Sequence, residues 1–598
     1  MKRMFLLLVL LSVITGTSAQ SEKKIVILHT NDLHSRLYGF SPEASYSPDV
    51  TGNDSTRGGF SRIAAILKNE REKNPGITLT IDGGDFLMGT LFHALEERTG
   101  FQLRLMNLMG YDVVVTGNHE YDFGPERLAR IIKTSDDMGE IPPVLAGNAV
   151  FTDKDTGDDQ LEKLLTDGLI KRSIVLERDG LRIGVFSVMG KDAEDVAPLS
   201  RPVKFSRQKS FARKMVRELK NEKCEIIICV SHSGITRDKN GQWEGEDVRL
   251  ARKVKGIDLI ISGHTHSTLP EPLVVRDIPI VQTGEYGKNI GRLSMIYRDG
   301  KLFVEGYSLI PVDDNVQGDP EIERIIGEQR DLIDSLLLSP LNISYQKPVA
   351  ESDFLLECNE YGDFMNSNLG PMIADAIHAY INKHSENGTD VSMVAVGVIR
   401  DRIIPGILTS PDVFRIMSLG SGSDDIPGYP LSRIYVTGRE LKSVLEILQV
   451  AYKSSPSNFC FYSGLRVRLD PEKGLLRKIL KIEIEEPSGA TTEVDFSKEN
   501  KTLYSISANS YMLEFIGIIK KMSFGLINVV PKDSEGEPIT DMKDAVIDMN
   551  SSVDGIQEGK EWLALMEFIG SMEDTDGDGI PDISRKYSVP VSVFSSEE

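Results

Sequence analysis

Cysteine is scarce in this chain. Only four occur among 598 residues, at Cys224, Cys229, Cys358 and Cys460. So few thiols exclude a disulfide scaffold, and the fold must therefore be stabilised by its hydrophobic core. A single disulfide between Cys358 and Cys460 remains an open alternative. Long apolar runs are also lacking, because after the N-terminal region no segment has the ~20 apolar residues that span a bilayer. We therefore expect no transmembrane segment once the leader described below is removed.

Positive charge is in short supply as well. The chain has 68 Lys and Arg residues against 90 Asp and Glu residues, which gives a formal net charge of −22. Such a surface repels polyanions, which disfavours a nucleic-acid polymer as a partner. A small, negatively charged substrate would need local positive charge from metal ions or arginine.

The N-terminus has the pattern of a secretory signal. Lys2 and Arg3 precede an apolar stretch from Met4 to about Ile14, and small residues follow up to Ala19. This order predicts a cleavable signal peptide at residues 1–19 and an exported protein, periplasmic or extracellular and cell-surface. A short membrane anchor is the alternative, and the sequence leaves the oligomeric state open.

The rest of the chain divides into two α/β parts. Residues 21–312 alternate nearly continuous apolar runs, such as KKIVILHT and CEIIICVSHS, with helix-like stretches, which predicts a layered α/β domain. Residues 313–345 contain an amphipathic pattern opening on Asp319 and Pro320, which predicts a connector helix. A second mixed domain follows at 346–560, and an acidic tail at 561–598.

Polar residues gather where five of the apolar runs end. The clusters are NDLH with Asp32 and His34, GGD with Asp85, GNHEYD with Asn118, His119 and Asp122, SHSG with His232, and GHTH with His264 and His266. Each cluster alone is weak, but strand ends meet at the edge of an open α/β sheet, where ligands bind. Together they offer carboxylate, imidazole and amide donors in one crevice.

The donor types indicate the kind of metal. Alternate residues of an extended segment point the same way, so the two side chains of NDLH, or of GHTH, can reach one spot. Glycines beside them permit close backbone approach. Mixed oxygen and imidazole ligands suit Zn, Mn, Fe, Ni or Co better than Mg or Ca. With more than four candidate ligands, we expect two ions.

The order D-x-H, GD, GNHE, H, GH-x-H resembles the calcineurin-like metallophosphoesterase superfamily. More narrowly, HTNDLH, GNHEYDFG and GHTH followed by a second domain resemble the secreted 5′-nucleotidase/UDP-sugar hydrolase/cyclic-phosphodiesterase family. The resemblance implies a four-layer α/β/β/α sandwich followed by a second α/β domain of the 5′-nucleotidase C-terminal type. It also implies that Asp32, His34, Asp85 and His266 bind one metal and that Asp85, Asn118, His232 and His264 bind the other, with Asp85 bridging.

The same resemblance makes His119 the catalytic histidine and Asp122 its partner, which would fix the tautomer and stabilise an imidazolium. The implied reaction is metal-assisted hydrolysis by a hydroxide between two cations about 3.5–4 Å apart. His119 would stabilise the phosphoryl charge or protonate the leaving oxygen. The alternative is that Asp122 caps the helix beginning near Pro125 and that His119 only fills a turn.

The second domain carries fewer signals. VGVIRDRIIPG resembles the family segment that carries a substrate-binding arginine, which points to Arg400, although a surface ion pair is the alternative. Family nucleotidases hold the base between two aromatic rings. Here the first position reads MSLGSG, with Leu419, and the second is Tyr511, while a further family Asn is Ala395. Loss of one ring puts nucleotide preference in question.

The tail contains DTDGDGIPD, which fits the first half of a calcium loop. Its candidate ligands are Asp574, Asp576, Asp578, Ile580 and Asp582. The Glu expected at the twelfth position is Arg585, so an acidic disordered tail is the alternative.

Three functions remain open at this point. The first is an exported two-metal phosphoesterase that acts on a small phosphate ester, such as a nucleotide. The second keeps the site but takes a cyclic nucleotide or a non-nucleotide compound. The third is a metal-dependent binding protein without catalysis.

Overall fold

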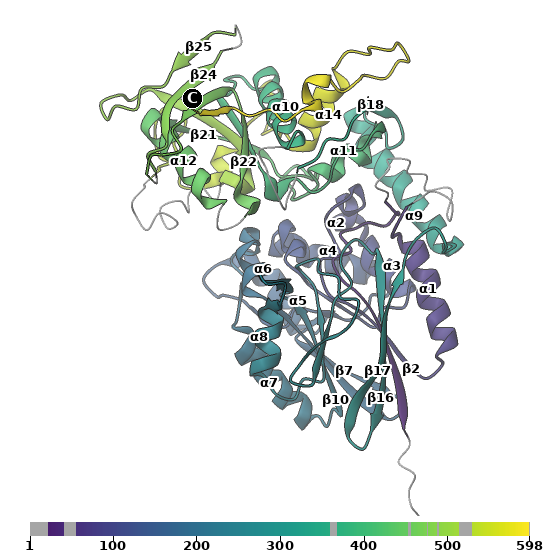
Figure 1. Cartoon of the computed structure of the whole chain (residues 1–598). Helices are drawn as coiled ribbons and strands as arrows, with labels where there is room; N and C mark the ends of the chain where they lie inside the picture. The colour runs from purple at the N-terminus through teal and green to yellow at the C-terminus, as the bar shows by residue number, and fades with distance from the viewer. Residues whose placement is uncertain are drawn as a thin grey trace, which may run out of the picture.

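The computed structural model describes residues 22–40, 56–358, 367–452, 456–474, 476–486, 489–513 and 529–596. The expected signal peptide lies outside these residues. Figure 1 shows two lobes, with the N-terminal half in the lower one and the C-terminal half in the upper one. No helix in the described ranges is both long and apolar enough to cross a membrane.

The lower lobe is built on two sheets. The first has the strand order β17-β16-β1-β2-β3-β4-β6. β1 is parallel to β2 and antiparallel to β16. Its strands are β1 (Lys23–Thr30), β2 (Ile77–Asp82), β3 (Val113–Val115), β4 (Val144–Leu145), β6 (Ile170–Lys171), β16 (Asn289–Arg298) and β17 (Lys301–Pro311).

The second sheet has the order β14-β15-β13-β10-β8-β7, with β13, β10 and β8 parallel. Its strands are β7 (Ser173–Arg178), β8 (Leu181–Met189), β10 (Ile226–His232), β13 (Leu259–Ser262), β14 (Leu273–Val275) and β15 (Ile278–Val281). The apolar runs expected as strands form strands of these two sheets, with KKIVILHT giving β1 and CEIIICVSHS giving β10.

Helices cover the outer face of each sheet, as Figure 1 shows. The first sheet is covered by α1 (Phe60–Lys73), α3 (Phe101–Leu108) and α4 (Pro125–Met138), and the second by α7 (Gln208–Asn221) and α8 (Glu246–Lys253). Alternate residues of one strand serve different layers: Ile25 and Ile27 lie between the sheets, whereas Val26 and Leu28 pack under the helices. The α/β/β/α sandwich is confirmed.

The expected connector contains α9 (Pro320–Ile333). Asp319 caps it by accepting hydrogen bonds from the backbone N–H groups of Glu321 and Ile322, at 3.0 and 3.3 Å, and Pro320 occupies its first turn. Both features agree with the sequence-based expectation.

The upper lobe holds two four-stranded sheets with helices. One has the order β21-β26-β19-β22 and the other β25-β24-β23-β27. The strands are β19 (Val391–Ala395), β21 (Leu431–Thr437), β22 (Cys460–Ser463), β23 (Leu465–Leu469), β24 (Ile479–Glu485), β25 (Thr491–Glu493), β26 (Leu503–Asn509) and β27 (Phe594–Ser596). The helices include α10 (Leu369–His384), α11 (Ser410–Ile416) and α12 (Gly438–Ala451).

The stretch from residue 561, expected above as an acidic tail, is folded into the upper lobe. It begins with α14 (Glu561–Gly570), whose Trp562 is fully buried and meets the Phe414 ring at 5.4 Å. It ends with β27, which pairs in parallel with β23. The apolar run WLALMEFI explains this packing, since Trp562, Leu565 and Ile569 share one helix face.

The two lobes are in direct contact. The Arg36 guanidinium lies 3.1 Å from the Asp401 carboxylate, and the ring of His93 lies 5.6 Å from that of Phe414. No disulfide joins Cys358 to Cys460, so the alternative of a bridge between them is wrong. An ion pair and an aromatic contact are thus among the interactions that join the lobes.

Candidate metal centre and catalytic pair

The polar clusters that follow the strands meet at one edge of the sandwich, facing the upper lobe. Asp32 and His34 follow β1, Asp85 follows β2, and Asn118 follows β3. His232 ends β10, and His264 and His266 follow β13. Both sheets thus contribute at their carboxyl ends, as parallel strands require.

One set of donors consists of Asp32, His34 and His266. Their ligand atoms lie within 4.8 Å of one another. The His34 Nε2 and His266 Nε2 atoms are 3.2 Å apart, and His266 Nε2 is 3.6 Å from Asp32 Oδ1. Nitrogens and carboxylate oxygens this close can converge on one ion.

A second set consists of Asp85, His232 and His264, again within 4.8 Å. Asp85 Oδ2 is 3.0 Å from His232 Nε2. The Asn118 side-chain oxygen lies 3.1 Å from His232 Nε2 and 2.9 Å from His264 Nδ1, so it belongs to the same set.

Asp85 lies between the two sets. Its Oδ2 atom is also 3.9 Å from His34 Nε2 of the first set. The structure therefore brings all seven expected ligands together, with Asp85 in the position of a shared carboxylate.

The backbone at the ligands is unusual. Five non-glycine residues of the two sets have φ between 50° and 77°, the sparsely populated left-handed region: Asp32, His34, Asp85, His264 and His266. Such conformations cost roughly 1–3 kcal/mol each and cluster at functional sites. Close approach also needs glycine, because a Cβ on Gly117 would lie 2.2 Å from Asp85 Oδ1.

Other side chains orient the ligands, and the sequence alone did not reveal them. Glu285 Oε2 is 2.8 Å from His266 Nδ1, and Asp192 Oδ2 is 3.2 Å from His264 Nε2. The buried Glu120 accepts hydrogen bonds from the backbone N–H groups of Asp85 (3.1 Å) and Gly117 (2.6 Å). Ligating histidines commonly have such partners. Of these residues only Glu120, inside GNHEYD, lies within a motif.

The charges of this cluster fit divalent cations. Asp32 and Asp85 are 0% and 1% exposed, and within the described ranges neither carboxylate forms an ion pair with Lys or Arg. Burial raises the pKa of Asp32. A buried anion is costly unless a cation compensates it. The mixed oxygen and imidazole donors are those of a transition-metal site.

His119 and Asp122 form a hydrogen-bonded pair beside the metal-ligand sets. His119 Nδ1 is 2.6 Å from Asp122 Oδ2, and the His119 backbone N–H donates to Asp85 Oδ1 at 2.9 Å. Burial lowers the pKa of His119, but the Asp122 and Asp85 carboxylates outweigh it, and the net direction is upward. The alternative that Asp122 caps the following helix is wrong, because α4 begins after Gly124 and no side chain caps its N-terminus.

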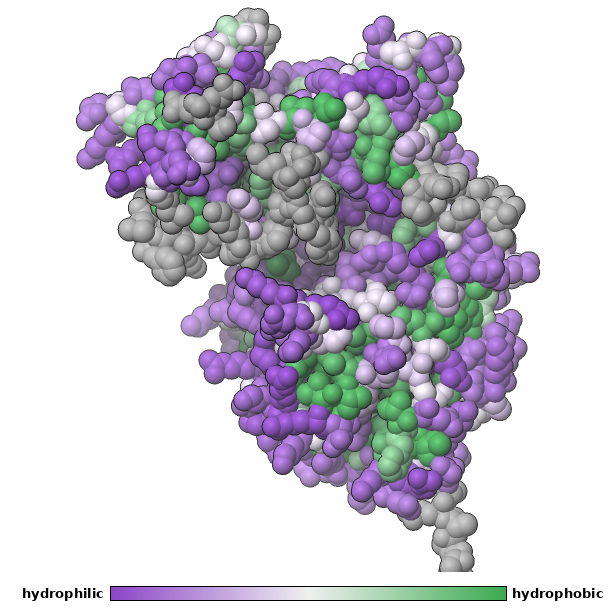
Figure 2. All heavy atoms as spheres, in the orientation of Figure 1, coloured by the Kyte–Doolittle hydropathy of each residue, from purple (hydrophilic) through white to green (hydrophobic). Residues whose placement is uncertain are grey.

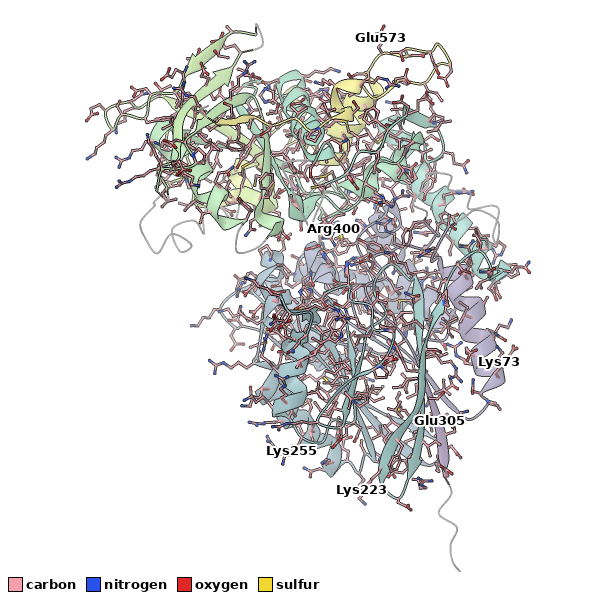
Figure 3. All side chains as sticks on the ribbon, in the orientation of Figure 1. Lys73, Lys223, Lys255, Glu305, Arg400 and Glu573 are labelled. Carbon is pink, nitrogen blue, oxygen red and sulfur yellow. The ribbon has the colours of Figure 1, made fainter. Side chains whose placement is uncertain are left out.

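A cavity of about 1010 Å³ opens in front of these residues, and both lobes line it. The lower lobe contributes Asp85, Asn118, His119 and His264, and the upper lobe contributes Arg400 and Tyr511. Figure 2 shows a recess where the lobes meet on a mostly hydrophilic face, and Figure 3 places Arg400 at that junction. Arg400 therefore lies at the site, not on a remote surface.

The aromatic lining of the cavity differs from the sequence-based expectation. Leu419, at the first expected ring position, lines the cavity, but so does Tyr429, which the sequence analysis missed. The rings of Tyr429 and Tyr511 stack at 5.2 Å with an interplanar angle of 20°. Tyr429 belongs to the stretch SGSDDIPGYP, which follows MSLG.

Comparison with known families agrees with this geometry. Residues 25–268 match the calcineurin-like phosphoesterase model, and residues 350–515 match the model of the 5′-nucleotidase C-terminal domain. The chain belongs to this two-domain 5′-nucleotidase family. Its members are phosphoester hydrolases that use divalent metals, so this protein is a metallophosphoesterase, which disfavours the alternative of a non-catalytic binding protein.

The individual relatives have low sequence identity to this chain but align with most of it. The trifunctional nucleotide phosphoesterase protein YfkN of Bacillus subtilis is 25% identical over 82% of this chain, which spans 32% of that longer protein. The 5′-nucleotidase of Mus musculus is 25% identical over 80% of this chain and 81% of its own length. The crystal structure of a 5′-nucleotidase precursor from Thermus thermophilus shares the fold, with a TM-score of 0.66, 19% identity and coverage of 96% and 99%.

The calcium-like loop lies far from this metal-ligand site. Figure 3 shows Glu573, next to the loop, at the far end of the upper lobe. Asp574, Asp576 and Asp582 bring oxygens within 4.8 Å of one another, and Glu351 of β18 (Pro348–Ser352) does so with Asp576 and Asp578. Glu351 thus offers a carboxylate that the loop lacks at its twelfth position, Arg585. The alternative of a disordered tail is wrong for the described residues 561–596.

Proposed function

We propose that this metallophosphoesterase is an exported, dinuclear enzyme that hydrolyses small phosphate esters of the 5′-nucleotide type. One observation carries the proposal: two donor sets that share Asp85 face the same cavity as Arg400 and Tyr511. Hydrolysis and substrate binding would then take place together at the junction of the lobes.

The metal assignment follows the two donor sets. Asp32, His34, Asp85 and His266 would hold one ion, and Asp85, Asn118, His232 and His264 the other, chosen from Zn, Mn, Fe, Ni and Co. When bound, such ions neutralise phosphoryl oxygens and supply a hydroxide nucleophile by lowering the pKa of coordinated water. Both carboxylates are buried and have no Lys or Arg partner within the described ranges, which supports this assignment.

His119 would act as the proton donor. Its Nδ1 is engaged by Asp122, which leaves Nε2 for the substrate. The nearby carboxylates favour the imidazolium form. A proton delivered to the leaving oxygen contributes typically ~10²–10⁴-fold to the rate.

Arg400 and Tyr511 would bind the rest of the substrate. A guanidinium grips phosphate or carboxylate with two parallel hydrogen bonds. Tyr511 is partly exposed in the cavity and offers one aromatic platform for a base. Stacking on such a platform is worth ~1–3 kcal/mol.

A cyclic nucleotide or a non-nucleotide phosphate ester is the alternative substrate. The stacking of Tyr429 on Tyr511 supports the non-nucleotide ester, since a base cannot lie between the rings in this arrangement. A cyclic nucleotide also carries a base, so this packing does not favour it. A substrate without a base would lose nothing from that packing.

The test is a panel assay of the purified protein loaded with each metal in turn. Nucleotides, nucleotide sugars, cyclic nucleotides and sugar phosphates are offered, and phosphate release is measured, with His119→Ala as the control. We expect hydrolysis of 5′-nucleotides by wild type and a loss of about 10²–10⁴-fold in kcat for the variant. Hydrolysis of cyclic or sugar phosphates alone would favour the alternative, and no hydrolysis of any ester would refute the proposal.

Export and calcium binding are further parts of the proposal. Cleavage near Ala19 predicts a mature protein in the periplasm or outside the cell, which N-terminal sequencing of that fraction checks. The carboxylates at Asp574, Asp576, Asp578 and Asp582, the Ile580 carbonyl and Glu351 would bind one Ca²⁺. Calorimetric titration of wild type and Asp574→Asn with Ca²⁺ tests this, and equal heats in both would refute it.

A further inference from the structure

Tyr429 belongs to the upper lobe but contacts the proton-transfer pair of the lower lobe. Its hydroxyl donates a hydrogen bond to Asp122 Oδ1 at 3.2 Å, while Asp122 Oδ2 is engaged by His119. Tyr429 is 2% exposed, and burial raises its pKa, so the phenol stays protonated and can only donate to the carboxylate. No other donor within the described ranges reaches Asp122 Oδ1.

The backbone around Tyr429 is shaped for this contact. Tyr429 N–H donates to the Leu419 carbonyl at 3.1 Å, and Gly428 N–H donates to the Gly420 carbonyl at 2.9 Å, which closes the segment 419–429 into a loop. A Cβ on Gly420 would lie 2.1 Å from the Tyr429 ring, and Gly420 has φ of 82°. Only glycine at this position lets the ring lie where it does.

The upper lobe anchors the loop from behind. Buried Lys560 pairs with Asp424 at 2.9 Å, and the Trp562 indole N–H donates to the Pro427 carbonyl at 2.7 Å. Ser423 N–H donates to Glu558 Oε1 at 2.9 Å. The loop is therefore held by the segment 558–562 of its own lobe.

The lower lobe holds the loop as well. The Arg127 guanidinium on α4 donates to the Gly422 carbonyl at 2.7 Å and to the Ser421 hydroxyl at 3.1 Å. Asp122 lies in the turn that precedes α4, so two consecutive segments of the lower lobe carry the carboxylate and hold the loop that reaches it.

We propose that Tyr429 is a positioning residue for the hydrolysis described above: its hydroxyl holds Asp122 in the rotamer that orients His119, and it does so only when the lobes are docked as here. The upper lobe thus completes the proton donor of the lower lobe. This inference rests on the proposed function for its kinetic consequences, but the contact itself can be tested without activity.

The kinetic test is Tyr429→Phe, which keeps the ring and removes the hydroxyl. The variant removes a hydrogen bond to a charged group, so we expect kcat to fall about 10- to 100-fold, while KM stays within about twofold of wild type. In an Asp122→Asn background the same change should have no further effect, since the hydroxyl acts through that carboxylate. Tyr587→Phe is the matched control, because this buried tyrosine donates to Asp375 at 2.7 Å, away from the site.

A second variant and a second readout separate this inference from the proposed function. Arg127→Met loosens the loop without altering Tyr429 and should lower kcat in the same direction. In metal-free protein labelled with ¹⁵N-histidine, the His119 Nδ1 proton should give a slowly exchanging signal that Tyr429→Phe abolishes and Tyr587→Phe preserves. Unchanged exchange in Tyr429→Phe, or equal kcat in an active wild type and Tyr429→Phe, overturns the inference. An inactive wild type with the expected exchange pattern refutes the proposed function alone.

Discussion

The two faces of the cavity are built differently. The lower face is made of residues at strand ends, with several ligands in strained backbone conformations and locked by partners such as Glu120 and Glu285. The upper face carries loop residues, among them Arg400 and Tyr429, beside residues of β19 and α12, and contacts within the second lobe hold the loop that carries Tyr429. The rigid lower face suits chemistry that tolerates little displacement, and the loops of the upper face can change with the substrate.

The largest effect should come from the shared carboxylate. Asp85→Ala removes a member of both donor sets, so we expect metal content to fall and kcat/KM to drop by about 10³-fold or more, since metal charge stabilisation is worth several kcal/mol. Metal analysis and steady-state kinetics measure this. Asp82→Asn is the matched control, because Asp82 is buried on the same sheet edge but belongs to neither donor set. Two ions per chain in Asp85→Ala would contradict the assignment.

A smaller effect should follow from a residue that only orients a ligand. Burial raises the pKa of Glu285, but His266 and Lys288 outweigh it and bring it to about 2, so the carboxylate is charged. Glu285→Gln keeps the shape and removes that charge, and we expect metal affinity to weaken about 10- to 100-fold. Competition with a chelator measures it. Lys288→Met, which removes the other partner of Glu285, should leave the affinity close to wild type, and an equal loss there would argue against a role through His266.

On the upper face, Tyr511→Leu should change recognition and not chemistry. Loss of one stacking platform costs about 1–3 kcal/mol, or roughly 5- to 150-fold in KM for a nucleotide. The kcat for the nucleotide, and the KM for any sugar phosphate that the enzyme accepts, should stay close to wild type. Parallel kinetics on both substrates test this, and a common change in both would place Tyr511 in the chemistry.

The smallest effect on catalysis should come from the second acidic cluster. Asp576 is exposed and near Glu351, and it follows closely after Glu573, which Figure 3 shows at the far end of the upper lobe from the cavity. Asp576→Asn should leave kcat within about twofold of wild type and abolish the rise in melting temperature that Ca²⁺ gives wild type. Thermal melts with and without Ca²⁺ are the measurement. A persistent calcium effect would show that other groups bind the ion.

The lower face could be predicted from the sequence because its ligand residues lie close in sequence to recognisable apolar runs. Asp32, Asp85 and His232 directly end or follow apolar runs, and the topology of parallel strands brings such positions together. Strand β16 and the edge strand β17 were not assigned, because polar or partly exposed residues interrupt their apolar pattern.

The upper face could not be predicted in the same way. The Tyr429 contact with Asp122 joins residues 307 positions apart through a loop whose course depends on Lys560 and Trp562. Helix α14, which contains Trp562, was also not predicted, because the residues around its apolar run are acidic. Neither feature has a local pattern that points to its partner.

Anomalous diffraction from crystals of the metal-loaded protein tests the central claim most directly. The account predicts two ions, one on each side of the Asp85 carboxylate, with Asp32, His34 and His266 around one and Asn118, His232 and His264 around the other. A single ion, or two ions that share no carboxylate, would contradict it.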